Sequence, residues 1–141
     1  MGKQGFQSSI AWQRAMDLNE AVDIALAGNR NFGFKDQLFR AALSICNNLA
    51  EGFEMPTTPH QLRYLWIAKG SSNEVCSMLL LAQRRGYFPE PEVDRMLNLQ
   101  DEVSRLIRSY IDKKSSTWRR FPGGRTVLFL WLALSTGVWA R

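Results

Sequence analysis

Residues 34–53 read FKDQLFRAALSICNNLAEGF, and this stretch carries two adjacent apolar stripes at helical spacing. At about 100° per residue the two stripes cover an arc of roughly 200°. The polar strip that remains consists of Arg40, Ser44, Asn47 and Glu51. One seam of a helix bundle needs only about 100° of apolar surface. The stretch therefore predicts a helix that is buried on two sides, by neighbours within a bundle or by another subunit.

The sequence that follows predicts a turn and a second helix. Thr58 as N-cap, Pro59 at the first helical position and Gln61 three residues after the cap fit a capping box. We expect this helix to run to about Arg85, where Gly86 ends it. Its predicted inner face consists of Tyr64, Leu65, Ala68, Val75, Cys76, Leu79 and Ala82.

Two further amphipathic helices are predicted on either side of this pair. One covers about residues 10–27, on the helical spacing of Trp12, Ala15, Leu18, Val22 and Ala25. The other covers about residues 90–113, on the spacing of Val93, Met96, Leu97, Gln100, Val103, Ile107 and Tyr110. Four amphipathic helices with short connections predict an all-α, antiparallel up-down four-helix bundle. It would span residues 10–113, after an N-terminal extension of residues 1–9.

Residues 114–141 form a predicted C-terminal tail of different composition. They hold five basic residues and no acidic one, whereas residues 1–113 hold 13 of each, so the net positive charge belongs to the tail. The apolar tail spans residues 126–140, and its 14 mostly apolar residues from 127 to 140 would be about 21 Å long as a helix, short of the roughly 30 Å of a membrane core. We expect no membrane span, but a disordered or artefactual extension, or a segment that packs on an oligomer.

Residue types that carry out catalysis are sparse. Cys46 and Cys76 lie on apolar helix faces, which favours buried free thiols over reactive ones. His60 falls in the first turn of a helix, is expected to be exposed, and has no partner that would make it a general base. No nucleotide-binding or zinc-protease motif occurs. We predict a scaffold or interaction protein rather than an enzyme, without catalytic residues, cofactor, metal or small-molecule substrate.

The N-terminus is polar and lacks the apolar run of a signal peptide. A cytoplasmic protein with reduced cysteines is therefore the expectation.

A few polar residues among apolar ones predict a buried polar network. Glu74 lies seven residues after Ile67 and seven before Leu81, so the three share one stripe, and a buried carboxylate there needs a partner. Arg40 is the predicted partner, because a guanidinium tolerates burial better than an ammonium. The predicted network consists of Arg40, Asn48, Glu51 and Glu74. It would fix helix register or oligomer contacts, and a ligand site is the alternative.

Basic residues give a second set of candidates, for contact with nucleic acid. They are Arg63, Lys69, Arg84, Arg85, Arg119 and Arg120. Trp66, which points away from the predicted inner stripe, and Trp118, beside the last two arginines, could stack on bases. The alternative is an ordinary solvated face with aromatic residues at the edge of the core.

Several short motifs occur together: WQRA at 12–15, QLFRAALSI at 37–45, NLAEGF at 48–53 and, in the next helix, LRYL at 62–65 and IAKGS at 67–71. Over about residues 10–112 the chain thereby resembles the four-helix-bundle proteins of intervening sequences in bacterial 23S rRNA genes. The resemblance implies a ring-like homopentamer without an established biochemical activity. It also implies kinship with the accessory protein of diversity-generating retroelements, which binds RNA and a reverse transcriptase. A homo-oligomeric scaffold is thus the first hypothesis. The second is an accessory protein that binds nucleic acid, acting with a ribosomal RNA or a reverse transcriptase.

Overall fold

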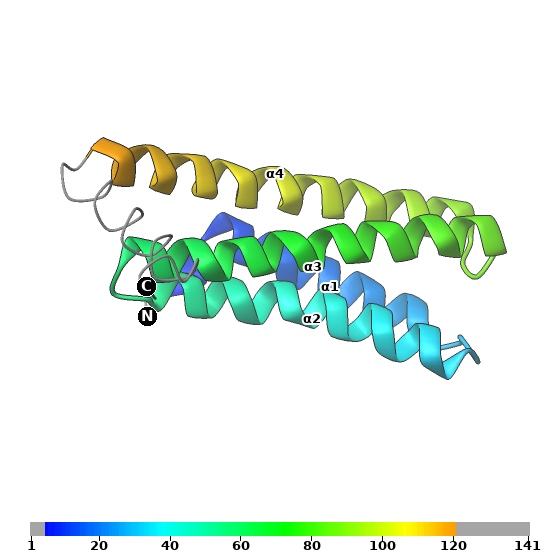
Figure 1. The fold of residues 1–141 in the computed structure, drawn as a ribbon. Helices are drawn as coiled ribbons and strands as arrows, with labels where there is room; N and C mark the ends of the chain where they lie inside the picture. Colours follow the sequence, from blue (N-terminus) through cyan, green and yellow to red (C-terminus); the bar gives the residue numbers. More distant parts are fainter. Residues whose placement is uncertain (1–4, 121–141) are drawn as a thin grey trace, which may run out of the picture.

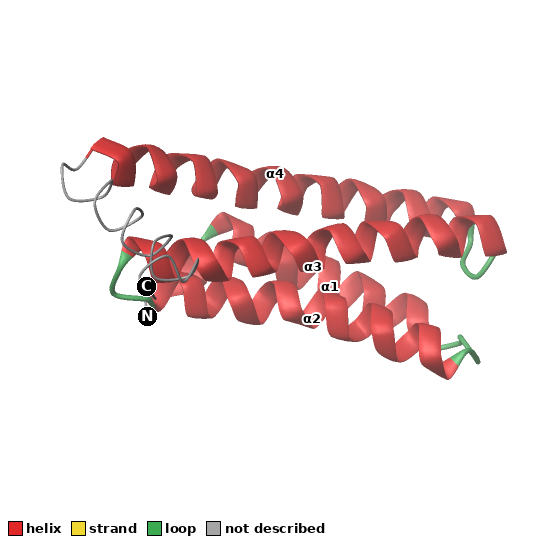
Figure 2. Ribbon diagram, viewed as in Figure 1, coloured by secondary structure: helices red, strands yellow, loops and turns green. Residues whose placement is uncertain are grey.

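The structure is a computed structural model that describes residues 5–120. These residues form a short 3-10 helix, η1 (Gly5–Ser8), and four α-helices: α1 (Ile10–Leu26), α2 (Phe32–Glu54), α3 (Thr58–Arg85) and α4 (Glu90–Arg120). The helices lie side by side with their short connections at the two ends of the molecule (Figure 1). No strand occurs in the described part of the chain (Figure 2). The predicted all-α fold with four helices is confirmed.

The four helices pack in cyclic order around one hydrophobic core. Helix α2 packs on α1 and α3, and α4 packs on α3 and α1, so that α1 and α3 lie diagonally across the bundle. Fully buried side chains come from every helix, among them Leu18, Leu38, Leu49, Leu65, Leu79 and Ile107. Helix η1 closes one end, where Phe6 N donates to Glu54 Oε1 at 3.0 Å and the Phe6 ring lies edge-on to Trp12.

The wide apolar arc of α2 is largely accounted for inside the bundle. One side of the arc packs on α1 and the other on α3. Leu38, Ile45 and Leu49 are fully buried, whereas Leu43 is partly exposed and Phe32, at the first position, is almost bare. Burial of α2 on two sides, as predicted, therefore needs no second subunit.

The predicted capping box of α3 is wrong by one residue. The N-cap is Thr57, whose backbone is extended (φ −124°, ψ 145°), and its carbonyl accepts from Gln61 N at 3.0 Å. The Gln61 side chain donates to Met55 O at 2.7 Å instead of returning to the cap. Thr58 is already helical, which places Pro59 at the second helical position. Proline is tolerated there because the backbone N–H groups of the first turn have no partner within the helix.

Helix α4 extends seven residues beyond its predicted end at Lys113, as far as Arg120. The sequence contains neither glycine nor proline between Pro91 and Pro122, so nothing local ends the helix at Lys113. Ile111 continues the buried stripe past Ile107. The predicted start of the tail at residue 114 therefore falls inside α4, and residues 121–141, including the apolar run, lie outside the described residues. No helix within residues 5–120 is long and apolar enough to cross a membrane.

Candidate functional site

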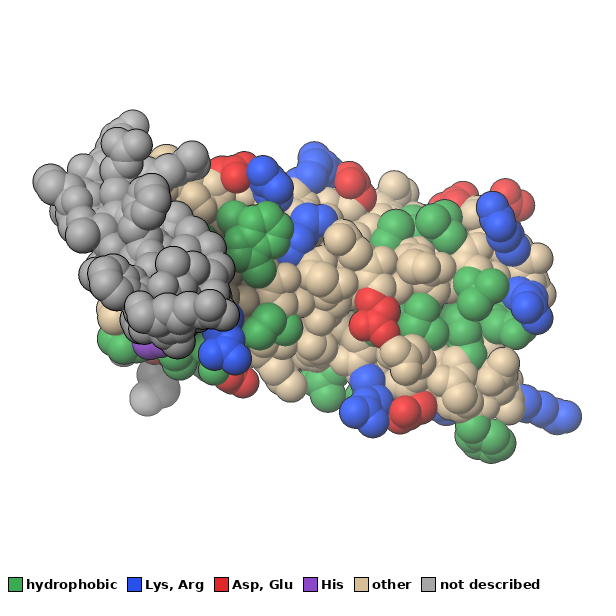
Figure 3. Space-filling view, in the orientation of Figure 1, with side chains coloured by type: hydrophobic (Ala, Val, Ile, Leu, Met, Phe, Trp, Pro, Cys, Tyr) green, Lys and Arg blue, Asp and Glu red, His purple; other side chains and the backbone are tan. Residues whose placement is uncertain are grey.

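Large apolar side chains are exposed on the side of α3 that faces away from the bundle. The inner face of α3 is formed by six buried residues at spacings of three and four: Leu65, Ala68, Ser72, Val75, Leu79 and Ala82. The opposite side, here called the outer face of α3, consists of Arg63, Trp66, Ile67, Gly70, Asn73, Glu74, Ser77, Leu80, Leu81 and Arg84. Four of its side chains are large and apolar, and they are about half-exposed: Trp66 (50%), Ile67 (42%), Leu80 (47%) and Leu81 (42%). Hydrophobic patches separated by polar surface are visible on the side of the molecule where α3 lies in front (Figure 3).

The predicted buried polar network is wrong. The stripe Ile67, Glu74 and Leu81 exists, but it points outward because the six buried residues named above take the inner face. Glu74 is exposed and accepts a hydrogen bond from Gln37 Nε2. Arg40 is exposed as well and lies 3.8 Å from Asp36 on its own helix.

The two remaining members of that network also lack the predicted role. Glu51 is exposed. Asn48 is half-buried, and its Nδ2 donates to Ser44 O and Ser44 Oγ at 2.8 and 3.1 Å. Both bonds stay within α2, and Asn48 contacts neither Arg40 nor Glu74.

Buried polar contacts do exist, at the middle of α3. Gln100 Nε2 of α4 donates to Ser72 O and Ser72 Oγ, both at 3.0 Å, with both residues buried. On the other side, Ser71 Oγ lies 2.8 Å from Ser44 Oγ of α2. The position of Gln100 in the predicted inner stripe of α4 was the available signal, because a buried amide requires a partner. These bonds fix the register of α3 between its two neighbours, so the outer face is held on a rigid element.

The candidate nucleic-acid contacts do not form one compact patch. Arg63, Arg84 and Arg85 are exposed and make no ion pair with any residue that the structure describes. Arg63 and Arg84 share the outer face but stand about 31 Å apart. Lys69 is engaged by Ser104 Oγ at 2.7 Å and Asn73 Oδ1 at 2.9 Å.

The remaining candidates lie on α4. Arg119 and Arg120 end the helix, and only their backbone is described. Trp118 is half-buried in the last turn. Trp66 is the aromatic residue of the outer face, and the guanidinium of Arg108 lies 5.7 Å from its ring centre. One face of the Trp66 indole is therefore already covered by a cation of the bundle itself.

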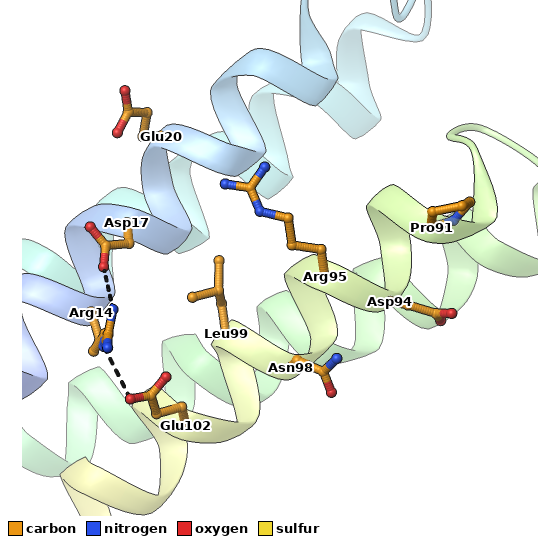
Figure 4. A pocket seen from close by; sticks show the side chains of 9 residues that line it. All are labelled: Arg14, Asp17, Glu20, Pro91, Asp94, Arg95, Asn98, Leu99 and Glu102. Carbon is orange, nitrogen blue, oxygen red and sulfur yellow. Dashed lines mark hydrogen bonds and ion pairs between the residues drawn. The ribbon is translucent and has the colours of Figure 1, made fainter.

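An open groove of about 750 Å³ lies between α1 and α4 (Figure 4). Arg14 bridges its walls, with Nη1 3.1 Å from Asp17 Oδ2 and Nε 3.0 Å from Glu102 Oε1. The hydrogen bond to Asp17 and the charge of Glu102 raise the pKa of Arg14 further above its usual value. The lining has two arginines and four carboxylates but no hydroxyl, thiol or imidazole, so the groove holds no serine–histidine or cysteine–histidine pair.

The cysteines and the histidine occupy positions without catalytic geometry. Cys46 is buried as predicted, and burial raises the pKa of its thiol to about 11, so it stays protonated at neutral pH. Cys76 is half-buried. His60 is exposed as predicted, with Nδ1 2.9 Å from Thr57 Oγ1. No group of three His, Cys, Asp or Glu residues within residues 5–120 is arranged to hold a metal ion.

Comparison with known proteins agrees with the fold and adds no catalytic assignment. The sequence pattern of the 23S rRNA-intervening sequence protein family matches residues 7–109. Six solved chains match the structure. One is a protein of unknown function from the S23 ribosomal protein family of Bacteroides thetaiotaomicron VPI-5482, 20% identical in sequence, with a TM-score of 0.68 over 73% of this chain and 96% of that one. No curated protein matches the chain.

Proposed function

The chain belongs to the 23S rRNA-intervening sequence protein family, and from this premise we propose that it is a non-enzymatic interaction protein that works as a homo-oligomer. The observation that carries the proposal is the outer face of α3. Its four large apolar side chains are half-exposed although the helix is held firmly on both sides. Single exposed apolar residues are common, whereas two pairs of them on one helix face favour an interaction surface.

A ring-like homopentamer in the cytoplasm is the assembly that we propose. The number of subunits comes from the family resemblance, and the bundle supports self-association through what it leaves uncovered. The inner face of α3 is occupied by α2 and α4, so only its outer face is available to a second copy.

The mass of the full chain in solution tests this proposal. Sedimentation velocity and light scattering at micromolar concentration should give about five times the chain mass of 16.1 kDa. Leu81→Asp places a charge on the outer face and should reduce the mass. Asn98→Asp, which adds the same charge beside the α1–α4 groove, should leave it unchanged. A clean monomer of the unaltered chain would contradict the proposal.

A second candidate function, an accessory protein that binds structured RNA, is favoured by the charge of α3. This helix has four basic residues and one acidic residue, and Arg84 and Arg85 stand together at its end without an ion pair to any residue between 5 and 118. The RNA would be a ribosomal RNA or the template of a partner reverse transcriptase.

Retention on structured RNA at low salt tests this second candidate. Binding should weaken steeply as salt increases, because cations held by the phosphates are released on binding. Exchanging either Arg84 or Arg85 for Glu should lower the affinity and reduce the salt slope, while Lys35→Glu on α2 changes the charge by the same amount and serves as the control. Absence of retention at low salt would remove this candidate.

A further inference from the structure

The helices of the bundle differ in net charge, and the charge of α3 is opposite in sign to that of α1 and α2 together. Helix α3 has four basic residues and one acidic residue, an excess of three positive charges. Helices α1 and α2 together have three basic and six acidic residues, an excess of three negative charges. Fields of opposite sign on two sides of one molecule attract copies of that molecule to each other.

The surface between α1 and α2 carries part of this charge, Asp23 and Asp36 against Lys35, beside exposed apolar side chains. A groove of about 400 Å³ is lined there by Asp23, Leu26, Phe32, Lys35, Asp36 and Phe39. Phe32 is 81% exposed, the most exposed large apolar side chain of residues 5–118. Met16 lies seven residues before Asp23, and Leu43 lies seven after Asp36, so these two exposed side chains extend the same surface. Here it is called the α1–α2 face.

The two surfaces lie at the same height along the bundle. Helix α2 begins at the end where α3 stops, as the 5.0 Å contact between the rings of Phe34 and Tyr87 shows. Asn31 Nδ2 also donates to Tyr87 Oη there, at 3.4 Å. Leu80, Leu81 and Arg84 therefore stand level with the groove around Phe32. Because α3 borders α2 but lies diagonally from α1, its outer face is oblique to the α1–α2 face rather than directly opposite.

We infer that the outer face of α3 in one copy binds the α1–α2 face of the next copy. The inference rests on the homo-oligomer proposed above and assigns its contact. Leu80 and Leu81 pack on Phe32, and Arg84 lies between Asp23 and Asp36. The contact joins two different surfaces, so it is a head-to-tail contact. Because both surfaces lie at the same height along the bundle, successive copies are not displaced along the bundle axis. The oblique angle between the two surfaces rotates each copy relative to the last, which favours a closed ring.

Complementation between two variants tests this contact. The first variant, Leu80→Asp with Leu81→Asp, blocks the outer face of α3. The second, Phe32→Lys with Asp36→Lys, makes the α1–α2 groove basic and blocks it for Arg84. All four positions are exposed, and an unchanged helical circular dichroism spectrum confirms folding. Each variant alone should be monomeric, whereas an equimolar mixture should form a dimer, because one intact surface of each kind remains.

Different outcomes separate failure of this contact from failure of the oligomer. If the wild-type chain is an oligomer and the second variant has the same mass as the wild type, the contact is overturned. An oligomer built from α3–α3 contacts would be unaffected by the Phe32→Lys and Asp36→Lys changes. A mixture that stays monomeric overturns it too. A monomeric wild-type chain overturns the homo-oligomer itself. If removal of residues 121–141 then produces an oligomer, the occupant of the α3 face is the C-terminal segment of the chain and not a second copy.

Discussion

The two faces of α3 differ in the size of their side chains, and the exposed face has more of the large apolar ones. Half of the inner face is built from small residues, since Ala68, Ser72 and Ala82 hold three of its six buried positions. The outer face has larger apolar side chains, Trp66, Ile67, Leu80 and Leu81, and leaves them half-exposed. Small residues let the backbones of neighbouring helices approach closely, so close packing selects the inner face here. The large side chains outside are then free to bind another molecule.

This contrast divides the residues of one helix between two tasks. Inner residues contribute to the free energy of unfolding of the bundle, and outer residues contribute to association. Substitutions at matched positions on the two faces should therefore separate the tasks.

The largest difference in the free energy of unfolding is expected between Leu79→Ala and Leu81→Ala. Leu79 is fully buried, so its truncation should lower the free energy of unfolding by about 3 kcal/mol through lost burial and a cavity. Leu81 is 42% exposed, and its truncation should cost less than about 1 kcal/mol. Urea unfolding measures both, at concentrations where sedimentation shows one species for each variant. Equal losses would mean that the outer face stabilises the fold as much as the inner one.

Replacement of two helical glycines by alanine is expected to change the free energy of unfolding in opposite directions. A Cβ on Gly52 would lie 3.0 Å from Tyr64 Cβ and 3.6 Å from the Gln61 carbonyl oxygen, whereas one on Gly70, in the outer face, would meet nothing within 4 Å. Gly52→Ala should cost about 1–2 kcal/mol, because the crowding against α3 exceeds the gain in helix propensity. Gly70→Ala should gain about 0.5–1 kcal/mol by propensity alone. Thermal unfolding of both variants checks the signs, and a stabilising Gly52→Ala would show that α2 and α3 can separate freely.

The sequence could predict the four helices and most inner positions, because each inner stripe repeats at helical spacing. It also oriented most of α3, since five of the six buried positions of α3 lie in the predicted inner face. It could not exclude burial of a second stripe on the same helix. Ile67, Glu74 and Leu81 form a stripe as regular as that of Leu65, Ser72 and Leu79, and only the approach of α2 and α4 decides between them. The predicted network around Glu74 failed for that reason.

Two features of the candidate site were accessible to sequence reasoning only in part. Trp66 could be placed outside the inner stripe, but its pairing with Arg108 depends on how α4 lies beside α3. The groove at Phe32 could not be predicted, since it is made where α1 ends and α2 begins, and the helix starts two residues before its predicted first turn.

The smallest effect concerns how firmly Trp66 is tied to α4. A double-mutant cycle with Trp66→Leu and Arg108→Gln should give a coupling energy of about 0.5 kcal/mol, the size of an exposed cation–π contact. Arg108 also donates to Asp112, four residues on, which holds the guanidinium in place. Arg105 pairs with Asp101 at the same spacing but has no aromatic partner among the described residues, so a cycle with Arg105→Gln should give no coupling. Coupling well above 1 kcal/mol would make Trp66 a part of the α3–α4 contact, and only Ile67, Leu80 and Leu81 would then remain free to bind a partner.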